Sequence, residues 1–481
     1  MTPRLVTALT FLLTTTSLAQ PPAPPASPQL VLQDTTYAGK PARTGRFHVW
    51  EDRAAAAGRV ISLDVVVLPA LDQSHKPDPV FIFAGGPGQN VATLPDEWVS
   101  NGIRRDRDIV LVSQRGTGGD NRLTCQLVGS DDNLQGYLDP IFDERAFREC
   151  LASLSKRFDL TQYSTANAVD DIDELRKALG YDKINLYGGS YGTRAELEYI
   201  RRHGDTVRLA ILNGVAPISL LNPLHHARSA QVVLDLILDE CAAKPAAVAA
   251  FGDLRRAFND VIARLDAAPA EATVTSPAGK RVKVRVTHDA FAEALRVIMY
   301  YDRSQVPMLI RAAADGNFDD VAQVGIESNR ALRDSLAFGM LLCVTCAEDL
   351  DRITDEMIAR ETAGTFLGDQ RVRSQKAVCD FWPRSALPED ASQPVTSDVP
   401  VLLLSGTYDP VSPRRFAEEA ATHLRHSLHV VAPGAHGVHG PCVEGIIRAA
   451  LDSGSVEGID TSCVAQMRPQ PFALPAPADD I

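Results

Sequence analysis

The sequence has no cluster of Lys and Arg residues that could face a phosphate backbone, and 61 Asp and Glu outnumber 48 Lys and Arg. A chain with a formal net charge of -13 repels nucleic acids, so no nucleic acid is expected as a partner. Gross disorder is also excluded, because 45% of the residues are hydrophobic and 23% are charged. The apolar run near the N-terminus is too short for a membrane span, which needs about 20 apolar residues.

The first 19 residues have the pattern of a signal peptide. A short segment with one charged side chain precedes the apolar residues 5–13, and the sequence SLA at 17–19 supplies the small residues of a cleavage site. Residues 20–39 begin with a Pro/Ala-rich stretch and are predicted to form a linker, and the Pro-rich residues 469–481 are predicted to form a tail. The sequence therefore predicts export to the periplasm or the extracellular space.

All eight cysteines follow the predicted signal peptide, which suggests up to four disulfides in an oxidising compartment. A single C-x-x-C at 343–346 has no second close pair, so it is a weak signal for zinc or for redox chemistry. Eight cysteines allow on the order of 100 connectivities, and sequence proximity is only a weak guide among them. Proximity favours three pairs and leaves a fourth, long-range one: Cys125–Cys150, Cys346–Cys379, Cys442–Cys463, and Cys241–Cys343.

Short, wholly apolar runs alternate with helical patterns in both the first and the last third of the chain. Such runs are typical of parallel strands covered on both faces, and the alternation predicts an α/β sheet. From 217 to 395 the pattern is mostly helical, with one strand-like stretch at 281–286. We therefore predict one sheet domain, formed by 40–216 and 396–468, which is interrupted by a helical insertion at 217–395.

The sequence GGSYG at 188–192 lies between an apolar strand and a helix. The G-x-S-x-G pattern at a sharp strand-to-helix turn exposes a nucleophilic serine, here Ser190. The sequence GGPG at 85–88 follows an earlier strand and could direct backbone N–H groups at a developing oxyanion. We expect the N–H groups of Gly86 and Tyr191 to form this oxyanion hole.

A serine nucleophile needs a base and an orienting acid, which follow it in the order Ser, Asp, His on this fold. Asp409 and His436 each come shortly after a predicted strand, at the sheet edge where ligands bind. Asp398 precedes its strand and would lie at the opposite edge. His439 is the strongest rival for the base, whereas the remaining candidates fall in or before the last strand: His423, His426 and His429.

Several motifs resemble the prolyl iminopeptidase and tripeptidyl aminopeptidase group of α/β-hydrolases. They are GGPG at 85–88, QRGTG at 114–118, GGSYGT at 188–193, GTYDPV at 406–411, CAED at 346–349 and CDFWP at 379–383. The resemblance covers about residues 40–472 and implies an α/β-hydrolase fold, a mostly parallel sheet flanked by helices, with a mostly helical cap.

The resemblance also implies a serine exopeptidase that acts at the free N-terminus of peptides and needs no cofactor or metal. Glu348 and Asp349, in a motif similar to that of the family, are candidate partners of the substrate amine, or they simply solvate a helix end. Two other classes stay open: a secreted carboxylesterase or lipase with the same three residues, and an inactive hydrolase fold that serves as a binding module.

Overall fold

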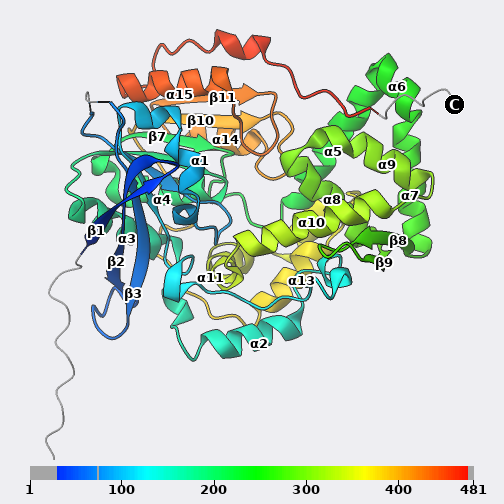
Figure 1. Ribbon diagram of the computed structural model, residues 1–481, viewed down its shortest axis with the longest axis horizontal. Coiled ribbons are helices and arrows are strands. Elements are labelled where there is room, and N and C mark those ends of the chain that lie inside the picture. Colours follow the sequence, from blue (N-terminus) through cyan, green and yellow to red (C-terminus); the bar gives the residue numbers. More distant parts are fainter. Residues whose placement is uncertain (1–29, 73–74, 475–481) are drawn as a thin grey trace, which may run out of the picture.

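The computed structural model describes residues 30–72 and 75–474 (Figure 1). Its centre is a nine-stranded sheet in the order β1-β2-β3-β5-β4-β6-β7-β10-β11. The pairs from β1 to β5 are antiparallel, and those from β5 to β11 are parallel. The strands are β1 Val31–Tyr37, β2 Lys40–Trp50, β3 Val60–Leu68, β4 Val80–Phe83, β5 Ile109–Val112, β6 Ile184–Gly189, β7 Val207–Asn213, β10 Val401–Gly406 and β11 Ser427–Ala432.

Alternate residues of the central strands face two different hydrophobic clusters. In β4, Phe81 and Phe83 pack with α3 and α4, whereas Val80 and Ile82 pack with α15 on the opposite face. A sheet buried on both faces requires the continuous apolar runs that the sequence contains. The helices around the sheet are α1 Pro95–Val99, α2 Glu144–Leu154, α3 Thr165–Ala178, α4 Tyr191–His203, α14 Arg415–Ala421 and α15 Pro441–Ser453. The α/β-hydrolase fold is confirmed, with the parallel strands ending at one edge.

The insertion after β7 divides into two parts. Helices α5 to α10 and the hairpin β8–β9 enclose a hydrophobic cluster of their own, on the right in Figure 1. Helices α11 and α13 instead contribute their apolar side chains to the cluster beneath the sheet. The elements are α5 His226–Ala243, α6 Pro245–Phe251, α7 Leu254–Ala267, β8 Ala270–Thr275, β9 Arg281–Val286, α8 His288–Tyr301, α9 Val306–Ala314, α10 Asp319–Ser335, α11 Phe338–Glu348, α12 Asp355–Thr362 and α13 Gln370–Cys379.

The structure differs from the sequence-based expectations in local detail. Strand β1 lies within the range assigned to the linker, because residues 31–37 pair antiparallel with β2 at one edge of the sheet. Helix α3 has Ser164 as its N-cap, because the Ser164 hydroxyl accepts a hydrogen bond from the backbone N–H of Asn167. The predicted signal peptide and most of the predicted tail lie outside the described residues.

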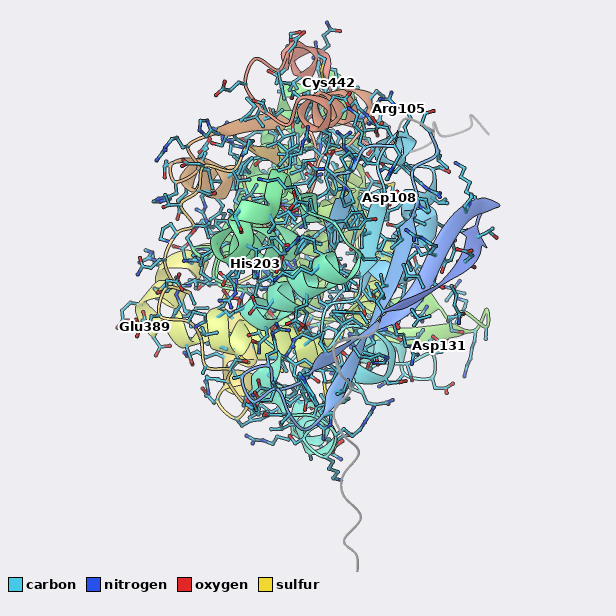
Figure 2. The ribbon with its side chains drawn as sticks, turned by 90° about the vertical axis from the view of Figure 1, so that its left-hand side faces the viewer. Arg105, Asp108, Asp131, His203, Glu389 and Cys442 are labelled. Atoms are coloured by element: carbon cyan, nitrogen blue, oxygen red, sulfur yellow. A yellow bond between two sulfur atoms is a disulfide. The ribbon has the colours of Figure 1, made fainter. Side chains whose placement is uncertain are left out.

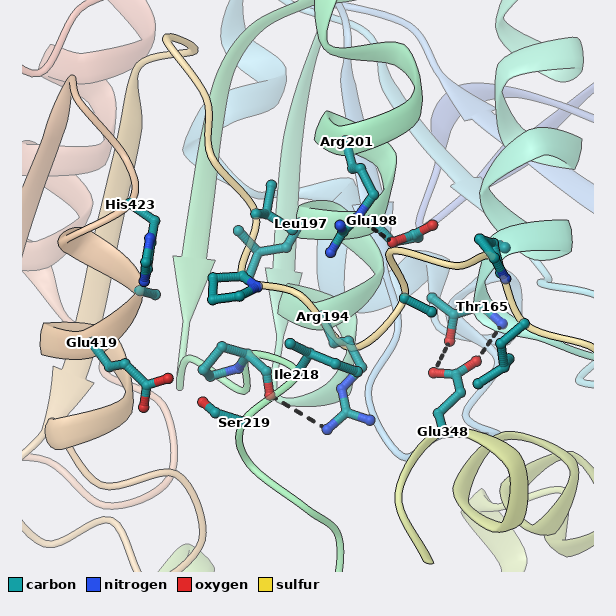
Figure 3. Close-up of a pocket in the computed structure, with 18 residues that line it drawn as sticks. Thr165, Arg194, Leu197, Glu198, Arg201, Ile218, Ser219, Glu348, Glu419 and His423 are labelled. Atoms are coloured by element: carbon teal, nitrogen blue, oxygen red, sulfur yellow. Dashed lines mark hydrogen bonds and ion pairs between the residues drawn. The ribbon is translucent and has the colours of Figure 1, made fainter. Parts of the chain in front are cut away.

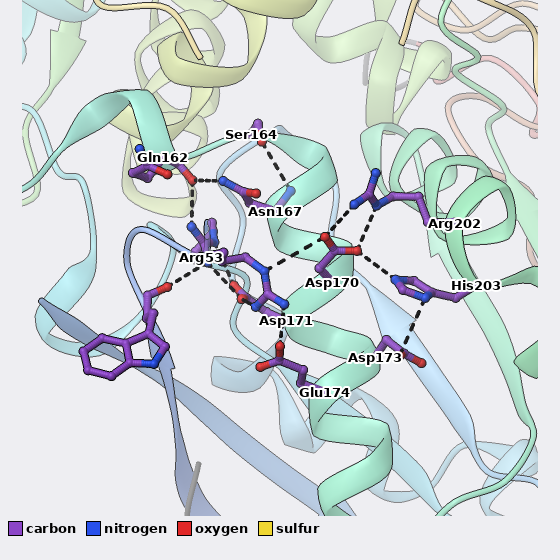
Figure 4. A network of polar contacts seen from close by, with 12 residues as sticks. Arg53, Gln162, Ser164, Asn167, Asp170, Asp171, Asp173, Glu174, Arg202 and His203 are labelled. Carbon is purple, nitrogen blue, oxygen red and sulfur yellow. Dashed lines mark hydrogen bonds and ion pairs between the residues drawn. The ribbon is translucent and has the colours of Figure 1, made fainter. Parts of the chain in front are cut away.

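Buried ion pairs join the N-terminal strands to the two helices that precede and follow β6 (Figure 4). Asp171 on α3 accepts hydrogen bonds from Arg53 and Arg115, and all three groups are largely buried. Asp170 on the same helix binds Arg202 and His203 at the end of α4. Asp171 therefore fixes α3, and Asp170 in turn fixes the end of α4, the helix that begins at the serine turn, against α3.

Three disulfides link Cys125 to Cys150, Cys346 to Cys379, and Cys442 to Cys463. Figure 2 labels Cys442 on the C-terminal segment, above the sheet. The Cys241–Cys343 pair is wrong: both thiols are free and buried, and they belong to the two separate hydrophobic clusters. No helix of the described part of the chain is long and apolar enough to span a membrane.

Candidate functional site

Ser190 lies at a sharp turn between β6 and α4, with a positive φ of 56° and a ψ of -127°. A non-glycine residue with positive φ is strained and persists only where its surroundings enforce it. Gly192 is part of that enforcement, because a Cβ there would lie only 2.3 Å from the carbonyl oxygen of Phe83. The flanking glycine therefore lets β4 pass close to the turn that presents the serine.

Asp409 and His436 form a hydrogen-bonded pair at the ends of β10 and β11. The His436 Nδ1 atom lies 3.0 Å from both carboxylate oxygens of Asp409. Asp409 is buried and also accepts hydrogen bonds from the backbone N–H groups of Val411 and Ser412 and from the Ser412 hydroxyl. Burial by itself would raise the pKa of Asp409, but His436 and these donors outweigh it and lower that pKa.

The rival residues have other partners. Asp398 pairs with the exposed Arg425, and His429 contacts the Ser405 hydroxyl at 2.9 Å. His439 lines a neighbouring cavity with Ser190 and His436, but within the described ranges it makes no hydrogen bond with Asp409. The remaining rivals lie elsewhere, with His423 at a second cavity and His426 beside Glu457.

One cavity brings the candidate residues together. Ser190, Tyr191, Gly86 and His436 all line it, beneath side chains of the helical insertion. Tyr191 is the first residue of α4, so its N–H has no partner inside the helix and is available to an oxyanion. Gly86 has a φ of 110°, which favours glycine, and the loop packs so closely that a Cβ on Gly85 would lie 3.4 Å from that of Ser190.

The structure separates the two candidate partners of a substrate amine. Asp349 lines the cavity of Ser190, and its Oδ1 accepts a hydrogen bond from Arg194 at 2.8 Å. Its Oδ2 is buried and, among the described residues, has no hydrogen-bond partner. Burial raises the pKa of Asp349 in spite of the nearby Arg194. This carboxylate is thus placed to accept a further donor from the cavity.

Glu348 lines a second cavity beside α4 (Figure 3) and is not among the residues that line the cavity of Ser190. Both of its oxygens accept hydrogen bonds from Thr165, one from the backbone N–H at 2.9 Å and one from the hydroxyl at 2.8 Å. Burial raises the pKa of Glu348 to about 7, although Arg194 and the Thr165 donors oppose the shift. Glu348 therefore links the end of α11 to the start of α3.

Sequence motifs missed several polar side chains of the roof. Arg296 and Tyr300 on α8 and Arg371 on α13 line the same cavity as Ser190. They lie in helices that contain no short motif, so only the three-dimensional arrangement reveals them. Across residues 30–72 and 75–474, no group of three or more His, Cys, Asp or Glu residues is arranged as a metal site.

Comparisons with known proteins support the resemblance. Residues 364–463, which contain Asp409 and His436, match the family described as TAP-like protein. The chain is 24% identical to the serine protease Hip1 of Mycobacterium tuberculosis, over 87% of this chain and 86% of that one. It is 23% identical to a tripeptidyl aminopeptidase of Streptomyces coelicolor, over 90% and 85% of the two chains.

Among solved structures, the proline iminopeptidase of Mycobacterium smegmatis is 14% identical, with a TM-score of 0.38 over 82% of this chain and 93% of that one. The family and the curated relatives confirm the resemblance to the prolyl iminopeptidase and tripeptidyl aminopeptidase group. They support a hydrolase of the serine peptidase type for this chain.

Proposed function

We propose that this chain, which is similar to serine peptidases over most of its length, is an exported serine exopeptidase that acts at the free N-terminus of peptides. The observation that carries the proposal is a single cavity lined by Ser190, by His436, which is paired with Asp409, and by Asp349, whose buried carboxylate is incompletely paired among the described residues. The first three residues supply acyl-transfer chemistry, and the fourth supplies a partner for an ammonium group.

In the proposed reaction, His436 takes the proton of the Ser190 hydroxyl as the oxygen attacks the scissile carbonyl carbon. The oxyanion that forms accepts hydrogen bonds from backbone N–H groups, those of Gly86 and Tyr191. Protonated His436 then gives its proton to the leaving amine, and a water molecule activated by His436 hydrolyses the acyl-enzyme. Asp409 orients the imidazole and stabilises its positive charge, in keeping with the two 3.0 Å contacts.

Asp349 is proposed to bind the substrate ammonium, and Glu348 is no longer proposed as a partner. Asp349 lines the cavity and its Oδ2 has no hydrogen-bond partner among the described residues, whereas both oxygens of Glu348 are already engaged with Thr165. A charge-assisted hydrogen bond to a buried carboxylate contributes about 1.5–3 kcal/mol. This interaction would favour peptides with a free amine over capped peptides and over simple esters.

The test compares one tripeptidyl p-nitroanilide with its N-acetylated form and with a short p-nitrophenyl ester. We expect kcat/KM for the free-amine anilide to exceed that of the acetylated form by about ten- to a hundredfold. Equal rates for the two anilides, together with faster ester cleavage, would favour the carboxylesterase alternative. No reaction of Ser190 with a fluorophosphonate would favour the inactive binding module instead.

Export is proposed on two grounds. Residues 1–19 have the signal-peptide pattern, and the three disulfides are typical of proteins that fold in an oxidising compartment. Fractionation of the producing cell should recover the chain outside the cytoplasm, with Ala19 and the residues before it removed. Mass spectrometry of the mature N-terminus would show retention of the first 19 residues if this proposal is wrong.

A further inference from the structure

We propose that Arg296 and Arg371 form a subsite for a carboxylate of the substrate, in the roof of the cavity that contains Ser190. This inference rests on the proposed function for the identity of the substrate, a peptide. The geometry that carries it is independent of the amine, because the two arginines come from α8 and α13 rather than from the segment of Asp349.

Arg296 is almost completely buried, with 2% of its surface exposed. Its Nε and Nη2 atoms bind the two carboxylate oxygens of Glu293, the residue one turn earlier on α8. Its Nη1 atom is buried and has no hydrogen-bond partner in the part of the chain that the structure describes. A guanidinium can bind two planar anions along different edges, so one edge of Arg296 remains for a ligand.

Arg371 lies on the neighbouring helix and forms no salt bridge with any described residue. Its Nε and Nη1 atoms are buried, and neither has a hydrogen-bond partner among residues 30–72 and 75–474. The guanidinium packs over the ring of Phe142, with 4.6 Å between its central carbon and the ring centroid. Burial lowers the pKa of Arg371 to about 10, with Arg296 contributing and Glu293 opposing.

The charges around the cavity favour an anion. Asp349 is the only carboxylate among the described residues that line it, and Arg194 already neutralises that group. Glu293 is similarly matched by Arg296. Arg371 therefore has no salt-bridge partner of its own among the described residues, and its buried Nε and Nη1 atoms are energetically costly unless a ligand supplies an acceptor.

His226 lines the same cavity as the two arginines. Burial lowers its pKa well below the ordinary value, and the charges of Arg296 and Arg371 lower it further. A lowered pKa favours the neutral form of the imidazole. The positive charges on this side of the cavity are therefore those of Arg371 and of Arg296, which is paired with Glu293.

Tyr300 connects this subsite to the reacting groups. Its ring packs edge-on against the ring of His436, with 5.1 Å between the centroids. The Arg296 guanidinium contacts the same side chain, with its central carbon 5.2 Å from the Tyr300 ring centroid. Tyr300 therefore contacts both the candidate anion site and the proposed base, so we expect a carboxylate bound there to belong to a residue near the scissile bond.

Two parts of a peptide carry a carboxylate: an acidic side chain near the scissile bond and the free C-terminus of a short peptide. Both would receive hydrogen bonds from Arg296 Nη1 and from Arg371, since guanidinium groups recognise planar carboxylates. We propose a site for a carboxylate of either kind, and the substrates used in the test distinguish a side-chain carboxylate from a C-terminal one.

The experiment measures kcat/KM for two kinds of matched substrate. The first set is tripeptidyl p-nitroanilides that carry Glu or its neutral isostere Gln at each position in turn. The second set is tetrapeptides with a free or an amidated C-terminus. In the wild type we expect at least one set to show a preference of about tenfold or more for the charged member.

Arg371→Gln should reduce that preference to within about threefold, because it slows the charged members more than the neutral ones. Arg373→Gln is the matched control, because Arg373 lies on the same helix with its side chain half-exposed and paired with Asp369. It removes the same charge and should keep the full preference. Should Arg371→Gln not fold, Arg371→Lys retains the charge but not the planar fork, and we expect it to keep only part of the preference.

The absence of a charge preference in the wild type, or an equal loss for charged and neutral substrates in Arg371→Gln, would overturn the subsite. A second readout separates this failure from that of the proposed function. The rate at which a fluorophosphonate labels Ser190 is measured with and without a Glu-containing tripeptide, using its Gln isostere as the control. Protection by the Glu peptide that Arg371→Gln abolishes would keep the subsite even if no anilide is cleaved.

Discussion

Two parts of the cavity differ in how their polar groups are paired. We call Ser190 with the His436–Asp409 pair the floor, and the side chains of the insertion, among them Asp349, Arg296 and Arg371, the roof. On the floor, Asp409 accepts hydrogen bonds from His436, from two backbone N–H groups and from Ser412. In the roof, Asp349 and Arg371 keep polar atoms that have no partner within the described residues. Buried polar groups are normally paired, so unpaired ones invite an explanation.

This difference distinguishes polar groups that bind one another in the free protein from polar groups that gain a partner only when a ligand binds. The floor residues must hold their mutual geometry before the substrate arrives, since preorganised hydrogen bonds are what speed acyl transfer. The roof residues gain partners only from a substrate. We therefore expect changes in the floor to affect all substrates, and changes in the roof to affect some substrates more than others.

Replacing Ser190 by alanine should produce the largest effect. Alanine retains the shape of the turn but removes the attacking oxygen, so kcat should fall by at least about 10⁴-fold on every substrate. Steady-state kinetics on a free-amine anilide and on an ester measure this loss. Ser335→Ala, at an exposed serine of α10, is the matched control and should be fully active. Residual activity within about tenfold of wild type would remove Ser190 from its proposed role.

Asp409→Asn should have the next largest effect, a fall in kcat of about 10³- to 10⁴-fold. The amide cannot stabilise the imidazolium and presents the wrong hydrogen-bonding group to His436 Nδ1. The loss should be similar for esters and peptides, because the floor serves both. The rival acid gives the control: Asp398→Asn changes an exposed carboxylate paired with Arg425 and should leave kcat unaltered. A loss confined to Asp398→Asn would reverse the assignment.

Asp349→Asn should lower kcat/KM for some substrates much more than for others. We expect kcat/KM for free-amine peptides to fall by about ten- to a hundredfold, with acetylated peptides and esters little changed. The variant also leaves Arg194 without its charge partner, so thermal unfolding must accompany the kinetics. Asp351→Asn is the control, since that half-exposed carboxylate pairs with Arg384. An equal loss on capped and free peptides would make Asp349 a structural residue only.

Glu348→Gln should have the smallest effect, and it should appear in stability rather than in rate. The pKa of Glu348 is raised from 4.5 to about 7, so between these values the folded protein binds a proton that the unfolded chain has released. The stabilisation from this group is therefore complete below about pH 4.5 and is lost as the pH rises through about 7.

The glutamine side chain stays neutral and can still bond to the backbone N–H and the hydroxyl of Thr165. The free energy of unfolding, measured in urea from pH 4 to 8, should therefore fall less steeply with pH in Glu348→Gln than in the wild type. Parallel curves would mean that Glu348 does not titrate in this range. Peptidase activity at a fixed pH should change little.

The sequence predicted the floor well because its signals are local. The glycines around Ser190 and the strands before Asp409 and His436 identify turns at one sheet edge from a few neighbouring residues. The roles of these residues remain a proposal. The fold class followed from the apolar runs of β4, β5 and β6, which only a sheet covered on both faces explains.

The roof was less predictable because its geometry depends on long-range packing. Arg296 and Arg371 are 75 positions apart and carry no motif, and adjacent residues Glu348 and Asp349 face different cavities. Treating 217–395 as one insertion also missed that α11 packs beneath the sheet. Every residue of α11 is buried, and such a helix lacks the amphipathic pattern that would reveal its neighbours.

Helix α11 has a mechanical consequence. At its start, the Ala337 amide donates a hydrogen bond to the Gly88 carbonyl of the glycine loop, and just past its end Asp349 binds Arg194 on α4. Because α4 begins at the serine turn beside that same loop, α11, α4 and the glycine loop are all joined to one another. We therefore expect this wall of the cavity to keep its position relative to the serine turn. Tyr301, at the end of α8, lines the same cavity with its side chain exposed, so we expect substrates to enter from that side.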